Sequence, residues 1–499
     1  VEGINVGKRI VELGGRPGRG VGGGAAVEAA VEADVLLFGA TGDLAYRKLF
    51  RALYHLRRSG QLTENSSFYG FGRRDLGREG LRERIAEALE GTLPASEYDE
   101  ELAAHCVANW HYVQVDEAAF DELAKELAEA GPKRDRIIYL ATASDFFGPL
   151  CRRLSDAGIL TPETRVVLEK PIGVDAETAT AVNAAVAEFF EESQIYRIDH
   201  YLGKETVQNL LALRFANVLF EPLWRSSVVE EVQITVAEDM GVEDRLGFYD
   251  ETGALRDMVQ SHILQLLCLV AMEVPRTLEP DAVREEKLKV LHALVPITGK
   301  DVDRYTVRGQ YSGYGANLEK ASVTESYVAI KAKVANWRWA GVPFLLRTGK
   351  HMSQKSARIV LKFREVPQSI FPGVARMKAN QLVLRLQPDD GIHLEMMAKS
   401  PGQGLNLQSV DLSLDFHEVS VARRPYSYER LLRDAVRGDS TLFLHRDEIE
   451  LAWKWVDPIV EHWQSRGRSG LHKYTKGSMG PVAAERLVDS REGWDNTPI

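Results

Sequence analysis

Asp34-Val-Leu-Leu-Phe38, followed directly by Gly39-Ala-Thr-Gly42-Asp43-Leu44, is the stretch at which a regular pattern begins in this chain. The first five residues form the short apolar run expected of a buried strand. Apolar residues then recur at three- and four-residue spacing up to Gly60, which predicts a helix that stops there. A glycine turn between a strand and a helix can place backbone N–H groups against a phosphate, although such turns are also common without a ligand.

Strands and helices alternate through the following part of the chain. Further strands are predicted at residues 67–71, 136–140, 165–168 and 194–198, and helices at 120–129, 150–156 and 176–190. This alternation favours a parallel sheet covered by helices on both faces. It indicates an α/β Rossmann-like dinucleotide-binding domain.

The pattern changes beyond about residue 230. Period-two apolar runs occupy residues 232–236, 327–331, 359–363 and 382–386, with few helices between them. Such runs predict a larger α+β domain with a mainly antiparallel sheet. We therefore expect a glycine-rich N-terminal extension with no assigned function at residues 1–33, a nucleotide-binding domain at 34–199 and the α+β domain at 200–499.

The composition excludes several classes of protein. The 499 residues carry 62 Lys plus Arg against 72 Asp plus Glu, a net charge of −10, which argues against a nucleic-acid partner. The three cysteines, Cys106, Cys151 and Cys268, form no C-x-x-C pair, so neither a disulfide scaffold nor a metal site is expected. The longest apolar run, 263–274, is too short to span a bilayer, so we expect no membrane partner and a cytoplasmic location.

The glycine loop and the second strand together indicate the cofactor. Gly39 permits a sharp turn, Gly42 permits close approach of a pyrophosphate, and Ala45 permits close helix packing. NAD enzymes usually carry an acid at the end of the second strand, whereas here Arg73 and Arg74 precede the first acid, Asp75. This favours NADP, with Arg73 as the better candidate. The alternative is that both arginines simply lie in a solvated surface turn.

A second signal is Arg197-Ile-Asp-His-Tyr-Leu-Gly-Lys-Glu205, which follows the last predicted strand of the first domain. Ligands bind at the carboxyl edge of such sheets. We expect His200, Tyr201 and Lys204 to offer two possible cations and a hydroxyl at a helix start, with Lys204 one helical turn from His200. This predicts a phosphate site. The alternative is a helix N-terminus capped by Asp199 with exposed basic residues.

The run from Arg197 to Glu205 resembles the signature of the glucose-6-phosphate dehydrogenase family of bacterial type. Other segments resemble that family in the same order, over about residues 34–481: Gly39–Leu44 with Lys48, Glu169-Lys170-Pro171, Leu213–Asn217, Arg256–Gln260 with His262, Asn336–Phe344, Arg347–Lys350 and Gln387-Pro388. Without this resemblance, His262 on an apolar predicted helix would more often be a structural histidine.

The resemblance implies that the chain oxidises glucose 6-phosphate to 6-phosphogluconolactone and reduces NADP, with NAD as a weaker alternative. His262 is implied as the general base and Asp199 as the carboxylate that orients it. The implied substrate-binding residues are Lys170, His200, Tyr201, Lys204, Glu238, Asp257, Lys350 and Lys355. The implied cofactor-binding residues are Gly39, Ala40, Thr41, Gly42, Asp43, Leu44, Lys48, Arg73 and Lys170. No metal is implied. The larger domain would bind substrate and form a homodimer or homotetramer through its sheet.

The sequence departs from the family pattern at several positions near these residues. They are Tyr46, where the family often has a basic residue, Ala143-Ser144 for Pro-Pro, Ser261 for Asn, and Met479 for Trp. None of these departures removes a residue implied in proton or hydride transfer. Two other functions remain open at this stage: a non-catalytic sensor of sugar phosphate or dinucleotide, and an oxidoreductase that acts on a non-phosphorylated sugar.

Overall fold

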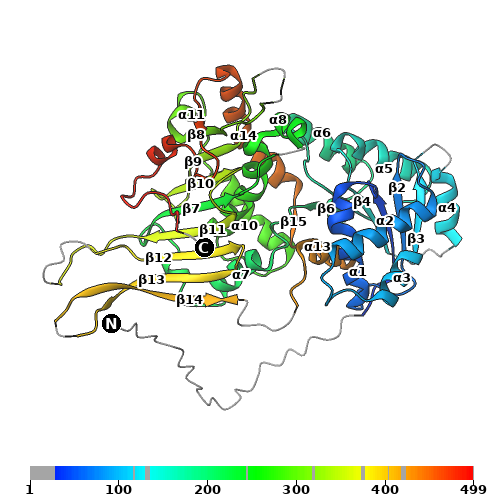
Figure 1. Ribbon diagram of the computed structural model, residues 1–499, viewed down its shortest axis with the longest axis horizontal. Helices are drawn as coiled ribbons and strands as arrows, with labels where there is room; N and C mark the ends of the chain where they lie inside the picture. Colours follow the sequence, from blue (N-terminus) through cyan, green and yellow to red (C-terminus); the bar gives the residue numbers. More distant parts are fainter. Residues whose placement is uncertain are drawn as a thin grey trace, which may run out of the picture.

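The computed structural model describes residues 29–115, 119–129, 135–242, 245–316, 318, 321–371, 377–402, 404–416 and 423–497. Most of the glycine-rich extension, residues 1–28, lies outside this range. Two sheets form the frame of the chain, and Figure 1 shows them side by side with helices between and around them.

The first sheet has the strand order β15-β6-β5-β4-β1-β2-β3. Its strands are β1 (Ala33–Phe38), β2 (Ser67–Gly72), β3 (Trp110–Gln114), β4 (Asp135–Leu140), β5 (Arg165–Leu168), β6 (Ile195–Ile198) and β15 (Phe443–Leu444). All pairs are parallel except β15 with β6. The first six strands thus follow the 3-2-1-4-5-6 order of a Rossmann-like sheet, which confirms the predicted fold class.

Helices cover both faces of this sheet. They are η1 (Ala45–Leu49), α1 (Phe50–Arg58), α2 (Gly77–Thr92), α3 (Glu100–Ala108), α4 (Ala119–Glu129), η2 (Ser144–Phe146), α5 (Phe147–Asp156), α6 (Ala176–Ala187), η3 (Glu192–Gln194) and α13 (Ser427–Arg437). Two apolar clusters result, because alternate residues of each strand point to opposite faces: Leu36 belongs to one cluster and Leu37 to the other.

The second sheet has nine strands in the order β14-β13-β12-β11-β7-β10-β9-β8-β16. They are β7 (Val229–Ala237), β8 (Thr306–Tyr311), β9 (Tyr327–Lys333), β10 (Pro343–Gly349), β11 (Ser356–Phe363), β12 (Gln381–Gln387), β13 (Gly391–Lys399), β14 (Leu407–Asp415) and β16 (Leu471–Tyr474). Only β7 with β10 and β8 with β16 are parallel among its described pairs. The mainly antiparallel sheet is therefore confirmed.

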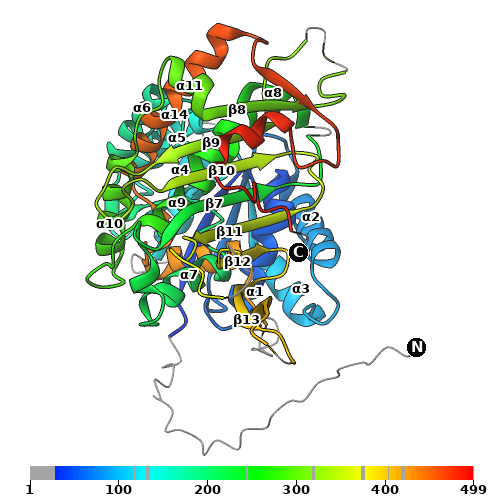
Figure 2. The ribbon, with the colours of Figure 1, turned by 90° about the vertical axis from the view of Figure 1, so that its left-hand side faces the viewer.

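The remaining helices lie mostly on one face of the second sheet. They are α7 (Glu205–Phe215), η4 (Glu221–Leu223), α8 (Leu246–Ala254), η6 (Leu255–Ile263), α9 (Leu264–Ala271), α10 (Pro280–Ala293), α11 (Lys300–Tyr305), α14 (Arg446–Arg466) and η7 (Val482–Leu487). Figure 2 looks onto the opposite face, which the C-terminal segment crosses. There Arg347 and Arg358 hold that segment through Asn496, Asp495 and Thr497.

One segment of the second part of the chain returns to the first sheet. Strand β15 pairs with β6, and α13 packs beside α1. The predicted division at residues 199 and 200 does not include this return. Periodicity cannot reveal it, because the pairing of Phe443 with Ile198 depends on contacts between residues far apart in sequence.

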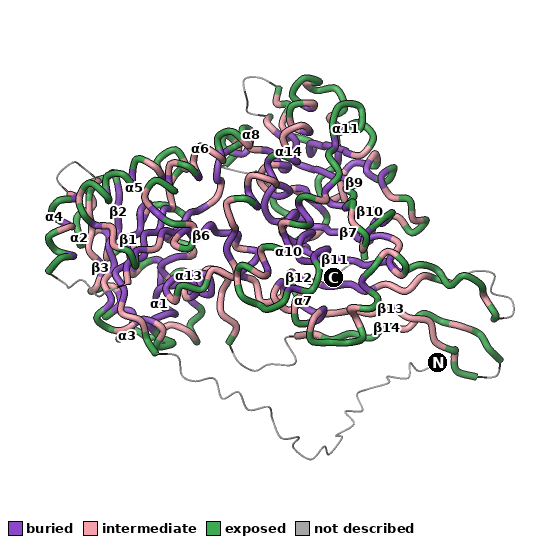
Figure 3. Tube along the Cα trace, turned by 180° about the vertical axis from the view of Figure 1, so that it is seen from behind, coloured by how far each residue is buried: buried purple, intermediate pink, exposed green. Residues whose placement is uncertain are grey.

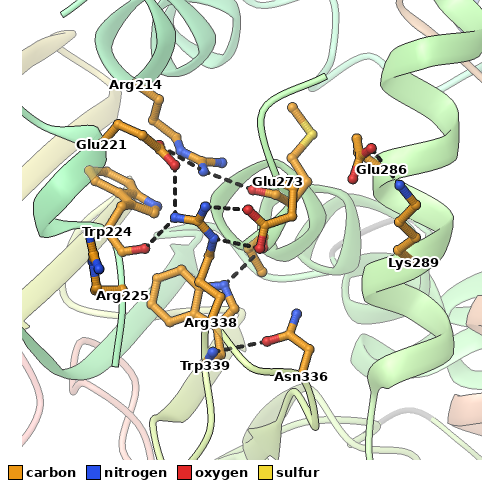
Figure 4. A network of polar contacts seen from close by, with 12 residues as sticks. Arg214, Glu221, Trp224, Arg225, Glu273, Glu286, Lys289, Asn336, Arg338 and Trp339 are labelled. Carbon is orange, nitrogen blue, oxygen red and sulfur yellow. Dashed lines mark hydrogen bonds and ion pairs between the residues drawn. The ribbon is translucent and has the colours of Figure 1, made fainter. Parts of the chain in front are cut away.

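A buried polar network fixes the helices that carry the central site. Arg214, at the end of α7, donates to the carbonyl oxygens of Leu269 (2.7 Å) and Met272 (2.8 Å), where α9 ends. Figure 4 shows Arg338 beside it, paired with Glu221 and Glu273. These contacts hold α7 and α9 together. They thereby also fix the segments that lead into these helices, residues 199–204 before α7 and η6 before α9.

Candidate active site

The glycine loop after β1 has the shape that its sequence predicts. Gly39 has a φ of +90°, and a Cβ at this position would lie 2.4 Å from the carbonyl oxygen of Ala141. The N–H of Gly42 donates to the Gly39 carbonyl at 2.9 Å, which closes the turn. Only glycine fits at position 39, because its positive φ and its close approach to Ala141 leave no space for a side chain.

The end of β2 lies against this loop. A Cβ on Gly72 would be 2.9 Å from Cγ2 of Thr41 and 2.6 Å from the hydroxyl oxygen of Tyr112. Arg73 and Arg74 follow and are exposed. Their guanidinium groups are therefore available to a phosphate on the adenosine ribose, at the position that distinguishes NADP from NAD.

Another arginine, which the sequence did not single out, reaches the same loop. Nη2 of Arg84, on α2, donates to the Thr41 carbonyl at 3.0 Å, and its guanidinium lies 5.2 Å from the ring centre of Tyr46. Tyr46 is one of the departures from the family pattern. A cation therefore remains beside the loop, supplied by a different helix.

The central contact joins β6 to η6, a π-helix. Nδ1 of His262 lies 2.5 Å from Oδ1 of Asp199, and both side chains are buried. The N–H of Tyr201 also donates to Asp199 Oδ1, at 2.9 Å. The carboxylate is thus held by the backbone and in turn fixes the imidazole. Irregular helical turns of this type often occur at functional sites.

The other ring nitrogen of His262 faces a lysine. Nζ of Lys170, which follows β5, lies 2.8 Å from Nε2 of His262 and 3.2 Å from Oδ1 of Asp257. The Lys170–Pro171 peptide is cis. An imidazole therefore lies between a carboxylate and an ammonium group.

Burial and neighbouring charges set the protonation of this pair. Burial lowers the pKa of His262, and the Lys170 ammonium lowers it further, against the opposing effect of Asp199. Burial alone would raise the pKa of Asp199, but the His262 imidazole brings it below its usual range. A neutral imidazole beside an ionised carboxylate is therefore the state at neutral pH. Asp199 alone would raise the pKa of His262, but the effect of burial is larger and lowers it.

Residues 200–204 form a turn and not the predicted first turn of a helix. Helix α7 begins at Glu205, and Lys204 has an extended backbone with ψ 133°. The prediction that His200 and Lys204 lie one helical turn apart is therefore wrong. The Tyr201 ring lies between them instead: its centre is 5.1 Å from that of His200 and 3.4 Å from Lys204 Nζ. The same ring stacks on His262, with ring centres 4.4 Å apart.

His200 is also less basic than expected. Burial lowers its pKa well below the usual value, and His262 and Lys170 lower it further. Its ring packs at 4.5 Å from that of His262 and stacks at 6.1 Å on Tyr428 from α13. In the free protein His200 is therefore a neutral hydrogen-bonding group, and the expectation of a second cation here is wrong.

Lys204 lies in a largely buried, cationic environment. Its Nζ donates to Oε1 of Gln387 at 2.9 Å, beside the cis peptide before Pro388. Burial lowers the pKa of Lys204 to about 7, and Lys355 contributes to the same shift. Lys355 also lowers the pKa of Lys48, after burial and Arg51. Several cations thus surround one region, which favours an anion there.

A ring of charges completes the site on the side of the second sheet. Lys350, after β10, pairs with Glu238, which follows β7. Burial would raise the pKa of Asp257, but Lys170 and Lys350 hold it below its usual range. Carboxylates and ammonium groups in alternation can accept from and donate to several hydroxyls at once.

The structure therefore brings most of the predicted residues to one place between the two sheets. These are Lys170, Asp199, His200, Tyr201, Lys204, Glu238, Asp257, His262, Lys350 and Lys355. Sequence reasoning gave no role to Gln387, although its motif was noted, and it missed Tyr428, which only the return of α13 brings here.

The three other departures form contacts that do not involve the His262 side chain. The Ser261 hydroxyl donates to the Asp257 carbonyl at 3.0 Å, within its own helix. The Ser353 hydroxyl contacts the Met479 sulfur at 2.8 Å. Ala143 precedes the short helix η2 with an extended backbone, φ −63° and ψ 145°.

Comparisons with known proteins identify one family over both parts of the chain. The family model "Glucose-6-phosphate dehydrogenase, NAD binding domain" matches residues 36–209, and "Glucose-6-phosphate dehydrogenase, C-terminal domain" matches residues 211–495. Glucose-6-phosphate 1-dehydrogenase of Rhizobium meliloti is 48% identical over 476 residues, which are 92% of this chain and 96% of that protein. Its counterpart from Mycolicibacterium smegmatis is 46% identical over 480 residues, with the same coverage.

Solved structures agree. A glucose-6-phosphate dehydrogenase in complex with its substrate glucose-6-phosphate has a TM-score of 0.86 at 33% identity, over 94% of this chain and 99% of that one. Glucose-6-phosphate 1-dehydrogenase from Mycobacterium avium has a TM-score of 0.82 at 36% identity, over 94% of this chain and 100% of that one. With both halves matched and the charged site assembled between them, this chain belongs to the glucose-6-phosphate dehydrogenase family.

Proposed function

We propose that this protein oxidises glucose 6-phosphate to 6-phosphogluconolactone and reduces NADP, the first step of the oxidative pentose phosphate pathway. The observation that carries the proposal is the buried Asp199–His262 contact of 2.5 Å, with Lys170 at the free face of the imidazole. NADP, when bound, supplies a hydride acceptor at its nicotinamide ring.

His262 is the general base of this reaction. Its Nδ1–H donates to Asp199, so Nε2 carries a lone pair that takes the proton of the anomeric hydroxyl once Lys170 has moved away from it. Asp199 keeps the imidazole in this tautomer and stabilises the imidazolium that forms. Such general-base assistance contributes roughly 100- to 10,000-fold to the rate.

The phosphate of the substrate binds among His200, Tyr201, Lys204 and Lys355. A phosphate dianion would restore the charge of Lys204, because it offsets the burial that lowers the lysine pKa to about 7. Glu238, Asp257, Lys350 and Lys170 bind the sugar hydroxyls. The phosphate is thus held at one end of the sugar and the hydroxyls along it, and this arrangement directs the anomeric carbon toward His262.

The cofactor-binding residues fit a dinucleotide. The glycine loop, Gly39 to Leu44, turns sharply after β1, and Gly42 at its centre carries no side chain that would hinder a pyrophosphate. In this proposal Lys48 binds the cofactor, Lys170 lies between cofactor and substrate, and Arg73 holds the 2′-phosphate of NADP. The absence of an acid at the end of β2 supports NADP over NAD, with NAD as the weaker cofactor.

A steady-state assay of nicotinamide reduction tests this function. We expect turnover with glucose 6-phosphate and NADP, and much less with glucose. Equal rates with and without the phosphate would favour an oxidoreductase of non-phosphorylated sugars. Binding of both ligands without reduction would favour a sensor.

We also propose that the chain forms a homodimer or homotetramer through its second sheet. Leu412 and Leu414 on β14 pair with Leu394 and Ile392 on β13 and place apolar side chains on one face. Leu412 and Leu414 are 56% and 46% exposed, and Figure 3 shows this edge in green and pink. Between it and α7 lies an apolar cavity of about 460 Å³, open to solvent.

A second copy of the chain suits this surface, because alternate apolar residues on an edge strand require a cover. Sedimentation of the wild type and of a Leu412→Lys, Leu414→Lys variant tests the assignment. We expect an oligomer for the wild type and a smaller species for the variant. An unchanged sedimentation coefficient would place the interface elsewhere.

The domain roles and the location follow as proposals. Residues 34–199, joined by α13 and β15, hold the cofactor, and the rest of 200–499 holds the substrate and the oligomer interface. A cytoplasmic location suits the reaction, since both the sugar phosphate and the dinucleotide are charged and do not cross membranes. Among the described residues, no helix has the length and apolarity to cross a membrane.

A further inference from the structure

A second cationic cavity lies away from the active site, at the β8–β16 edge of the second sheet. Its volume is about 320 Å³. Its lining comes from β8, β16, α11, the last turn of α14 and η7, and consists of Asp303, Thr306, Arg308, Trp463, Arg466, Ser469, Gly470, His472 and Arg486. None of these residues belongs to the site described above.

Three guanidinium groups converge on this cavity. Arg308 is only 4% exposed and lies 5.6 Å from the ring centre of Trp463. Its Nη2 donates to the carbonyl oxygens of Gly467 (2.5 Å) and Ser469 (2.9 Å). Arg486 Nη2 donates to the Thr306 carbonyl at 2.7 Å. Backbone carbonyls thus orient two arginines but leave their charges unbalanced.

The charges in the cavity do not cancel. The single carboxylate of the lining, Asp303, lies 3.8 Å from Arg466 and 3.3 Å from His462. Neither Arg308 nor Arg486 forms an ion pair within the described part of the chain. Three arginines and one aspartate leave an excess of two positive charges, since burial and the two arginines Arg486 and Arg308 keep His472 neutral by lowering its pKa.

The arginine network around Arg338 differs from this cavity, because its guanidinium groups contact carboxylates. There Arg338 pairs with two carboxylates, Glu221 and Glu273, and Arg214 approaches Glu221 (Figure 4). In a chain with a net charge of −10, acids are available to neutralise buried guanidinium groups. At the cavity, Arg308 forms no ion pair among the described residues, and the carboxylates that influence its charge, Glu325 and Asp303, act without such contact. This indicates that an external anion supplies the direct partner.

We propose that this cavity binds a small phosphorylated metabolite through Arg308, Arg466 and Arg486. A phosphate monoester carries a charge of about −1.5 to −2 at neutral pH, which matches the excess charge. The planar fork of arginine suits phosphate oxygens, and the volume leaves room for a group larger than phosphate alone. The adjacent Trp463 ring provides one apolar wall.

Calorimetric titration of the full chain with inorganic phosphate tests this site. The titration uses the Lys204→Ala variant, which lacks the main cation of the proposed phosphate-binding residues in the active site. The remaining phosphate binding then reports on the second cavity. We expect one saturable site per chain. Arg466→Gln, whose side chain is half exposed and pairs with Asp303 at 3.8 Å, should weaken it roughly tenfold, and Arg486→Gln at least as much.

Arg468→Gln is the matched control, because Arg468 is exposed on the same loop but does not line the cavity. It should bind phosphate like the background protein. Equal binding by all variants, or no saturable binding in the Lys204→Ala background, would overturn the proposal. A change in sedimentation of Arg466→Gln, without a change in phosphate binding, would also overturn it, because these arginines would then pair with acids of a second copy.

Discussion

Nζ of Lys170 lies 2.8 Å from Nε2 of His262, on the opposite side of the imidazole from Asp199. An ammonium group has no acceptor, so Nε2 must offer its lone pair and Nδ1 must carry the proton. Lys170 therefore occupies the place of the substrate hydroxyl in the free protein. It has to move from Nε2 toward the sugar before His262 can act as a base.

Asp199 and Lys170 should move the acid limb of the pH profile in opposite directions. Asp199 raises the pKa of His262 and Lys170 lowers it, within a net shift that burial keeps below the ordinary value of about 6.5. Asp199→Asn should therefore move the acid limb of kcat/KM to lower pH, and Lys170→Gln to higher pH. Both should also reduce turnover. Limbs that shift in the same direction would contradict the geometry.

Affinity for glucose 6-phosphate should fall as the pH rises above about 7. Lys204 loses its proton with a pKa of about 7 in the free protein, whereas the phosphate is already a dianion above its second pKa of about 6. Calorimetric Kd values between pH 6 and pH 9 check this. In Lys204→Ala, binding should be weaker and nearly independent of pH above 7; a wild-type slope retained in the variant would assign the titration to another group.

Arg73→Ala should weaken NADP much more than NAD. We expect the lost guanidinium to interact only with the 2′-phosphate, and a charge-assisted hydrogen bond of this type is worth about 1.5–3 kcal/mol, or roughly 10- to 150-fold in KM. Arg74→Ala, a neighbouring exposed arginine, is the control. Equal losses for both cofactors in Arg73→Ala would mean that Arg73 does not contact that phosphate.

Arg214→Met should destabilise the fold. The change leaves the carbonyl oxygens of Leu269 and Met272 without their donor and Glu221 without one of its partners, at a cost of about 3 kcal/mol. The urea midpoint should fall accordingly. Arg225→Met, at an exposed neighbour in Figure 4, should change it little, by about 0.5 kcal/mol or less. Similar midpoints for both variants would contradict the structural role of Arg214.

The sequence predicts local structure where periodicity is strong. The apolar run after Ala33 became β1, and the five predicted parallel strands lie within one residue of their observed bounds. Residues 200–204 were predicted as helical because their spacing allows it. The Asp199 carboxylate accepts the Tyr201 N–H instead, which stabilises a turn, and the same oxygen contacts His262, a residue 63 positions further along the chain.

The site itself was predictable mainly through the family resemblance. No pattern in residues 199–262 shows that Asp199 and His262 meet, since their contact depends on packing between two domains. The low basicity of His200 and Lys204 could not be predicted, because it depends on burial. The cavity at Arg308 brings together residues from five elements, so neither composition nor spacing indicates it.

The most direct measurement compares His262→Asn with the wild type, in binding of glucose 6-phosphate by calorimetry and in reduction of NADP by absorbance. Binding should be largely retained, because the phosphate and hydroxyl contacts remain, while turnover should fall about 100- to 10,000-fold. Turnover close to that of the wild type would show that the proton leaves the sugar through a different group.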